Sequence, residues 1–215
     1  MPMLHAQSFR ADEVGGTAAA ITRLAAGFVT HDWMCCLGFL SPARAASLRQ
    51  EAESLRAAGG FHPAGIGKGG ERRTGIRGDE VMWVDAGTAP LAEALQREEL
   101  TALREAINAA TYLGLRDFEG HYAVYPAGAA YARHVDRFRD DDRRVVSLVL
   151  YLNDAWEAGD GGELCLYAAA GDAAPAAKLL PAAGTLACFL SERVPHEVLP
   201  ARRTRLSFTG WFRRA

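Results

Sequence analysis

The 215-residue sequence has little of what marks membrane, secreted and nucleic-acid-binding proteins. No window of about 18 residues is free of charged side chains, so we expect no membrane span. Residues 1–12 have neither a basic start nor an apolar run, which argues against a secretory signal. The net charge is only -2 and the isoelectric point is near 6.3, which gives no general case for binding nucleic acid.

Cysteine is also scarce, and its spacing excludes the common cysteine sites. Cys35, Cys36, Cys165 and Cys188 form no C-x-x-C pair, and a disulfide between the adjacent Cys35 and Cys36 would be awkward. Small buried residues are the expected role of these thiols. A reduced, cytoplasmic protein is therefore predicted.

What is present is enough apolar sequence, 49%, to build a globular core. The first half is typical of helices, with apolar residues at helical spacing and a Ser-Pro start signal before the second of them. The three helices are expected at 15–28, 41–60 and 90–113. Between the last two, a glycine-rich stretch lacks the final G-K-[ST] of a phosphate-binding loop. We expect a strand pair with a mobile loop there, near 61–84.

From Phe118 onward the pattern changes to short strands separated by turns. They are expected at 118–125, 130–135, 144–153, 163–167, 184–190, 195–199 and 203–212, with 168–177 as a loop between strands. Closely spaced strands without helices between them indicate an antiparallel sandwich or small barrel. The predicted fold is α+β, a double-stranded β-helix of the jelly-roll or cupin type with N-terminal helices packed on one face. One domain is expected over 1–215, with 1–115 as mainly helical support and 116–215 as the β-helix core.

Two histidines and an aspartate in this second half are spaced as metal ligands. Because side chains at i and i+2 of a strand point to the same side, His134 and Asp136 can both face the interior. His196 begins a later strand and can approach from the opposite wall. Two imidazoles and one carboxylate on one face of an octahedron are typical of non-haem Fe(II) oxygenases. The alternative for His134 and Asp136 alone is a surface histidine beside an acidic loop.

Arg205 lies among the apolar residues Leu206, Phe208 and Trp211, which indicate a buried strand. A buried guanidinium needs an anion, and its planar fork matches a carboxylate. We therefore expect Arg205 to bind a carboxylate near the metal. A salt bridge at a strand edge is the alternative.

Several motifs occur in a fixed order along most of the chain. They are I-R-G-D from Ile76 with Trp83 after it, Y-P from Tyr125, Y-A-R-H-V-D from Tyr131, Y-L-N from Tyr151 with Trp156 after it, G-G-E-L from Gly161, P-H-E-V from Pro195, and T-R from Thr204 with Trp211 after it. With these motifs the sequence resembles the 2-oxoglutarate/Fe(II)-dependent prolyl hydroxylases, the hypoxia-sensing enzymes of animals and their bacterial relatives.

The resemblance implies a role for each residue of the site. It makes His134, Asp136 and His196 the iron ligands, and together with Arg205 the catalytic set. Arg205 and Tyr151 would bind the distal carboxylate of 2-oxoglutarate. Tyr125 and Thr209 would lie near the same co-substrate, and the substrate would meet Arg77, Arg144 and Trp211. The implied cofactors are Fe(II), 2-oxoglutarate and O2, with ascorbate as a supporting reductant.

The implied reaction is hydroxylation of a prolyl residue in a protein, with succinate and CO2 as co-products and a translation factor as one candidate target. Other readings stay open: a 2-oxoglutarate oxygenase for another residue or a small molecule, a non-enzymatic metal-binding sensor or interaction module, and a zinc hydrolase. His121 departs from the family pattern, because it shares strand parity with Tyr125 where an apolar residue is expected. It is either a pocket-lining donor near the co-substrate or a packed neutral histidine.

Overall fold

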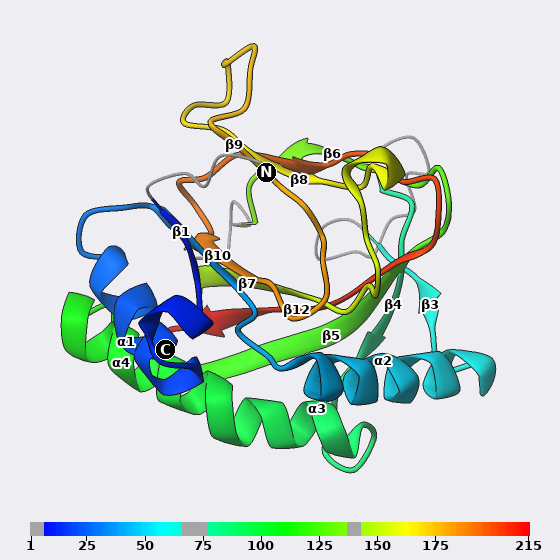
Figure 1. Ribbon diagram of the computed structural model, residues 1–215, viewed down its shortest axis with the longest axis horizontal. Helices are drawn as coiled ribbons and strands as arrows, with labels where there is room; N and C mark the ends of the chain where they lie inside the picture. The colour runs from blue at the N-terminus through cyan, green and yellow to red at the C-terminus, as the bar shows by residue number, and fades with distance from the viewer. Residues whose placement is uncertain (1–6, 66–76, 137–142) are drawn as a thin grey trace.

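Two β-sheets that face each other form the centre of the computed structural model, which describes residues 7–65, 77–136 and 143–215 (Figure 1). In spatial order the large sheet consists of β1 (Ser8–Arg10), β2 (Trp33–Leu37), β10 (Leu186–Leu190), β7 (Arg144–Tyr151), β12 (Arg205–Arg213), β5 (Asp117–Tyr125), β4 (Glu80–Trp83) and β3 (His62–Pro63). The small sheet consists of β6 (Tyr131–His134), β11 (His196–Val198), β8 (Leu164–Leu166) and β9 (Ala177–Leu179). This arrangement confirms the predicted double-stranded β-helix.

The helices cover the outer face of the large sheet, as the fold prediction required (Figure 1). They are α1 (Thr17–Gly27), α2 (Pro42–Ala57), α3 (Pro90–Leu95) and α4 (Thr101–Thr111). Helix α2 begins as the sequence indicates: the Ser41 hydroxyl accepts a hydrogen bond from the backbone N–H of Arg44 at 3.2 Å, and Pro42 follows. Within the three described ranges, no helix is long and apolar enough to cross a membrane.

Strand β12 divides its side chains between two environments. Leu206, Phe208 and Phe212 join the hydrophobic core under the helices. The alternate side chains face the small sheet and line a pocket between the sheets; they are Arg205, Ser207, Thr209 and Trp211. Period-2 alternation thus makes the central strand apolar toward the helices and polar toward the pocket.

Three parts of the fold differ from the sequence-based expectation. Strands β1 and β2 extend the large sheet, whereas the first half was expected to be mainly helical, with strands only near 61–84. Strand β9 pairs with β8, although no strand was predicted there. The helix expected over 90–113 contains a π-helical segment, Gln96–Leu100, between α3 and α4. The four cysteines are buried and free, as expected.

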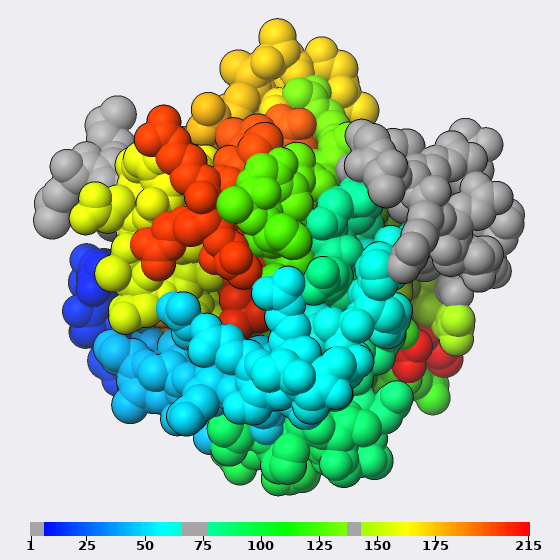
Figure 2. Space-filling view, turned by 90° about the vertical axis from the view of Figure 1, so that its right-hand side faces the viewer, coloured from blue at the N-terminus to red at the C-terminus, as the bar shows by residue number. Residues whose placement is uncertain are grey.

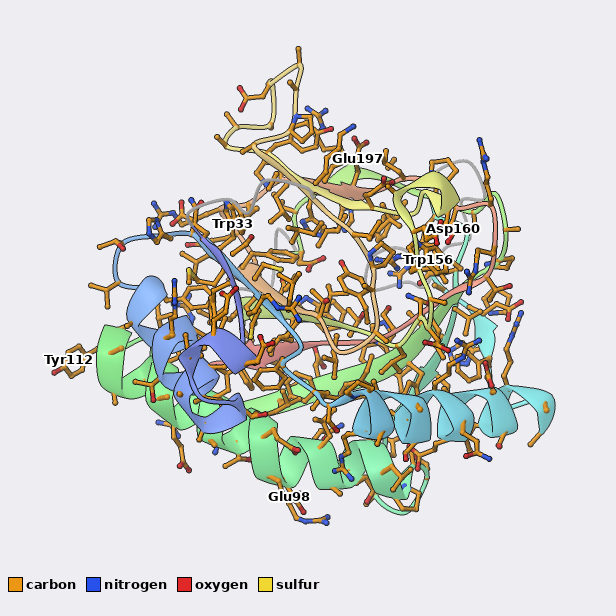
Figure 3. All side chains as sticks on the ribbon, viewed as in Figure 1. Trp33, Glu98, Tyr112, Trp156, Asp160 and Glu197 are labelled. Atoms are coloured by element: carbon orange, nitrogen blue, oxygen red, sulfur yellow. The ribbon has the colours of Figure 1, made fainter. Side chains whose placement is uncertain are left out.

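A hairpin-like finger, residues 167–176, joins β8 to β9 and projects from the molecule (Figures 1 and 2). Arg133 holds its base by donating to the backbone carbonyls of Ala170 and Asp172 at 3.1 and 2.7 Å, and by stacking over the Tyr167 ring. The Tyr167 hydroxyl donates to Glu197, which lies on the outer side of the small sheet (Figure 3). Two residues adjacent to predicted metal ligands, Arg133 and Glu197, therefore anchor the finger from outside.

Candidate functional site

The pocket between the sheets is built from rows of residues that β-sheet register aligns. On β12, Thr209 pairs with His121 of β5 and with Val149 of β7. Two pocket-facing rows along, Arg205 pairs with Tyr125. The opposite wall comes from the small sheet, where His134 and His196 are direct partners.

The register brings together the three residues predicted to bind metal. The Nε2 atoms of His134 and His196 lie 3.4 and 3.6 Å from Oδ1 of Asp136. The ligand atoms of all three residues lie within 4.8 Å of one another. Such a cluster can hold one divalent ion between two imidazoles and a carboxylate.

Backbone hydrogen bonds fix the orientation of both imidazoles. Nδ1 of His134 lies 2.8 Å from the carbonyl oxygen of Ala132, and Nδ1 of His196 lies 3.0 Å from that of Val194. A carbonyl oxygen only accepts, so each Nδ1 carries the proton and each Nε2 keeps its lone pair for a metal.

The second carboxylate oxygen of Asp136 has partners that the sequence reading missed. Oδ2 accepts from the Ser147 hydroxyl at 2.6 Å and from the Trp211 indole N–H at 3.0 Å. Ser147 also lies 2.9 Å from the hydroxyl of Ser191. These bonds leave Oδ1 for the ion. The available signal was Ser147 itself, a polar residue on the inner face of an otherwise apolar strand.

The charges within the triad stabilise each other. Burial opposes ionisation of Asp136, but His196 and His134 outweigh it and hold the pKa of this carboxyl well below its usual range. Burial likewise opposes a proton on His196, and the Asp136 carboxylate more than offsets it, so the pKa of His196 is raised. The pocket thus keeps a carboxylate ionised where a cation can bind.

Arg205 is 1% exposed and has no carboxylate partner among the described residues. Its guanidinium lies 5.0 Å from the ring centroids of both Tyr125 and Tyr151. The Nε of Arg205 and the hydroxyl of Tyr151 are buried without a hydrogen-bond partner in that part of the chain. Burial also raises the pKa of Tyr151 to about 12, so its hydroxyl remains a donor. A cation and a hydroxyl left unpaired side by side fit a carboxylate from a bound molecule.

The other predicted site residues lie at different depths. Tyr125, Thr209, Trp211 and Arg77 line the pocket, whereas Tyr151 lies behind the lining, beside Arg205. Arg77 forms a two-pronged ion pair with Asp79 at 2.6 and 2.8 Å. Arg144 does not line the pocket: its guanidinium lies 3.5 Å above the Trp211 ring and pairs with Glu119 at 2.7 Å. The loop expected to close over the site falls almost wholly on 66–76, outside the described residues.

His121 is both packed and pocket-lining, so the two alternatives for it are not exclusive. It is 1% exposed, and its ring lies 4.7 Å from Trp83 and 5.5 Å from Trp211, measured between centroids. Burial first, and then the charges of Arg77 and Arg144, lower the pKa of His121 to about 3. The imidazole is therefore neutral.

Comparison with known proteins gives the family. Residues 120–213 match the model of the 2OG-Fe(II) oxygenase superfamily. Human Egl nine homolog 1 is 34% identical over 145 residues, 64% of this chain and 33% of that protein, so the chain spans about a third of that relative's length.

Two solved structures match most of the chain. A prolyl-4-hydroxylase of Pseudomonas putida is 45% identical, covers 91% of this chain and 99% of its own, and superposes with a TM-score of 0.81. A prolyl hydroxylase of Trichoplax adhaerens, solved with a peptide fragment of the oxygen degradation domain of hypoxia inducible factor, is 25% identical, with coverages of 92% and 90% and a TM-score of 0.82. The chain belongs to the 2-oxoglutarate/Fe(II)-dependent prolyl hydroxylase family.

Proposed function

We propose that the protein is an Fe(II)- and 2-oxoglutarate-dependent dioxygenase that hydroxylates a prolyl residue of a protein substrate. The observation that carries the proposal is Arg205, which is buried without a carboxylate partner among the described residues, in the same pocket as His134, Asp136 and His196. A plain metal-binding module or a zinc hydrolase has no use for this carboxylate site. The similarity to the Pseudomonas prolyl-4-hydroxylase supports proline as the target.

The proposal gives the chain's residues separate tasks. His134, Asp136 and His196 hold Fe(II), while Arg205 and Tyr151 bind the distal carboxylate of 2-oxoglutarate. Tyr125 and Thr209 shape the wall beside it. When bound, Fe(II), 2-oxoglutarate and O2 supply the oxidising chemistry that converts a C–H bond to C–OH and releases succinate and CO2.

On the substrate side, Trp211 and Arg77 line the pocket, and Arg144 supports Trp211 from behind. We propose that the substrate is a peptide segment containing proline, with a translation factor in the cytoplasm as the candidate target. The free, buried cysteines are consistent with that compartment. We further propose that residues 1–215 act as one dioxygenase domain.

The first test is a spectrum of the purified protein with Fe(II) and 2-oxoglutarate under anaerobic conditions. Chelation of the keto acid by iron gives a weak visible charge-transfer band, which should be absent in His134→Ala and weaker in Arg205→Ala. The absence of a band in wild-type protein that demonstrably contains iron would rule out the dioxygenase proposal.

The second test identifies the residue that is modified. A peptide library with a fixed central proline and randomised flanks is incubated with O2, Fe(II) and 2-oxoglutarate, and hydroxyproline is measured. Mass gain of one oxygen on the central proline supports prolyl hydroxylation. Oxygen found on other residues would support the alternative, a 2-oxoglutarate oxygenase with a different target.

A further inference from the structure

His121 lies on a continuous path of side chains from the metal cluster to the protein surface. The Trp211 indole donates to Asp136, and His121 stacks on Trp211 at an interplanar angle of 29°. The Trp83 ring contacts both, with its centroid 4.7 Å from that of His121 and 6.2 Å from that of Trp211. Trp83 is 37% exposed, whereas Arg205 and Tyr151 are almost fully buried. Of these three rings, His121 and Trp211 line the pocket that holds the metal cluster, so a ligand in the pocket can reach both.

The strand register separates His121 from the co-substrate anchor. His121 and Tyr125 lie four residues apart on β5, which is roughly 13 Å along a strand. Tyr125 pairs with Arg205, which would hold the distal carboxylate, and the five-carbon chain of 2-oxoglutarate is shorter than this span. His121 is thus remote from the Arg205 end of the pocket, where the distal carboxylate would lie.

One ring nitrogen of His121 is not used for hydrogen bonding by the residues that the structure describes. Its Nδ1 is buried with no hydrogen-bond partner in the described part of the chain. Polar atoms buried in this way usually have a partner, and leaving one unpaired costs about 1–3 kcal/mol. The two cations that lower the pKa of His121 most already have carboxylate partners: Arg77 pairs with Asp79, and Arg144 pairs with Glu119. The neutral imidazole is therefore the group suited to an uncharged ligand.

We infer that His121 is a substrate-positioning residue, whose imidazole N–H donates a hydrogen bond to a backbone carbonyl of the prolyl segment, beside the aromatic ring of Trp211. The inference rests on the proposed function and adds a determinant of substrate binding to it. A prolyl nitrogen carries no hydrogen, so the carbonyls beside the ring are the polar groups by which the segment can be held. The Trp211 indole, which lines the pocket, offers an apolar face to the pyrrolidine ring.

Two pairs of variants separate hydrogen bonding from packing. His121→Asn places an amide near the Nδ1 position and is matched in shape by His121→Leu. His121→Gln places an amide near the Nε2 position and is matched in shape by His121→Met. His31→Leu, outside the pocket, controls for loss of a histidine. Thermal unfolding of each variant is recorded first, so that only folded proteins are compared.

The readout is the initial rate of hydroxyproline formation from the fixed-proline library at low peptide concentration, with succinate measured in parallel. In at least one pair, we expect the variant with the amide side chain to retain the wild-type rate within about twofold. The rate of its apolar match should fall about 3- to 10-fold, which corresponds to the loss of one neutral hydrogen bond. The ratio of succinate to hydroxyproline should rise in that hydrocarbon variant, because a misplaced proline leaves co-substrate turnover uncoupled.

Each contrary result has a distinct meaning. Equal rates and equal ratios in the amide and hydrocarbon variants would overturn the inference while the proposed function stands. If these variants also lose the Fe(II)–2-oxoglutarate band, His121 acts on the co-substrate rather than on the prolyl segment, and the inference is overturned. If wild-type protein shows the band but forms no hydroxyproline, the prolyl part of the proposed function fails, and this inference fails with it.

Discussion

The two oxygens of the Asp136 carboxylate have different surroundings. Oδ1 faces both histidines, and Oδ2 is held by Ser147 and Trp211. Partners of this kind hold a ligand in the geometry that the metal requires, and their loss typically lowers metal affinity 10- to 100-fold. We therefore expect Ser147 to support metal binding through Asp136, without touching the ion.

Ser147→Ala should weaken Fe(II) or Mn(II) binding by about 10-fold with the fold intact. Metal titration of the purified variant measures the change. Ser207→Ala is the matched control, because Ser207 is equally buried on the same face of the neighbouring strand and bonds to Thr209 rather than to a ligand. Equal affinities in the two variants would show that the Ser147 bond does not support the metal.

His121 should make stability depend on pH in a predictable direction. Burial and the charges of Arg77 and Arg144 lower its pKa from 6.5 to about 3 in the folded protein. Between these values the unfolded chain binds a proton that the folded chain does not. The free energy of unfolding should therefore fall as pH falls through this window, by up to about 1.4 kcal/mol per pH unit from this residue.

The comparison with His121→Asn isolates that effect, because all other titrating groups are common to both proteins. Urea unfolding at several pH values between about 5 and 8 should show a steeper loss of stability for wild type on the acid side. Parallel curves would mean that His121 is protonated in the folded protein as readily as in the unfolded one.

At the scale of secondary structure, the second half of the chain was predictable because its strands alternate. The expected strand 118–125 is observed as Asp117–Tyr125, and 203–212 as Arg205–Arg213. The expectation that His134 and Asp136 face the same side agrees with the structure, since both line the pocket, although Asp136 lies two residues beyond the end of β6. The periodicity of a strand's own sequence is enough to predict such strands, without knowledge of the strands that pair with them.

Elements whose existence depends on distant partners were not predictable in this way. Strand β2 is a continuous apolar run, nearly all buried, and such a run does not distinguish a strand from a helix. Strand β9 is short and begins within an alanine-rich stretch, and it is a strand because β8 pairs with it. The partners of Ser147 are likewise remote in sequence, at Asp136 and Ser191.

Strands β5 and β12 face each other at two glycines, and neighbouring atoms already occupy the space that a side chain would need there. Gly210 lies opposite Gly120, and a Cβ at Gly210 would clash with the carbonyl oxygen of Glu119 and the ring of Phe118. Gly210→Ala should therefore lower the free energy of unfolding by about 1–3 kcal/mol. Urea unfolding measures the loss.

Gly171→Ala, in the finger, is the matched control. A Cβ there would meet no atom within 4 Å, so we expect a change within about 0.5 kcal/mol. Similar losses in both variants would attribute the effect to glycine replacement in general rather than to the filled space beside β12.

For the whole molecule, the site connects the two sheets. His134 and His196 belong to the small sheet, whereas Arg205 and Tyr151 belong to the large one. A metal ion and 2-oxoglutarate bound together would link these walls. Ligands that bind only the folded state stabilise it by about 2.7 kcal/mol at a concentration of 100 times Kd.

Fe(II) added anaerobically should therefore raise the melting temperature, and 2-oxoglutarate should raise it further when the metal is present. Differential scanning calorimetry with each ligand alone and with both checks the order. His134→Ala should lose the metal-dependent part. Equal stabilisation by 2-oxoglutarate with and without metal would contradict a shared site.

The position of Trp211 also determines how the site can be observed. Its indole N–H bonds to the Asp136 carboxylate, so this fluorophore lies within a few bonds of the metal cluster. A paramagnetic ion held there should quench its emission and, less strongly, that of Trp83, whose ring centroid lies 6.2 Å from that of Trp211. Trp33 and Trp156 do not line the pocket and should report little of the event. Intrinsic fluorescence can thus follow metal loading in the unlabelled protein, and Trp211→Phe should lose most of the response.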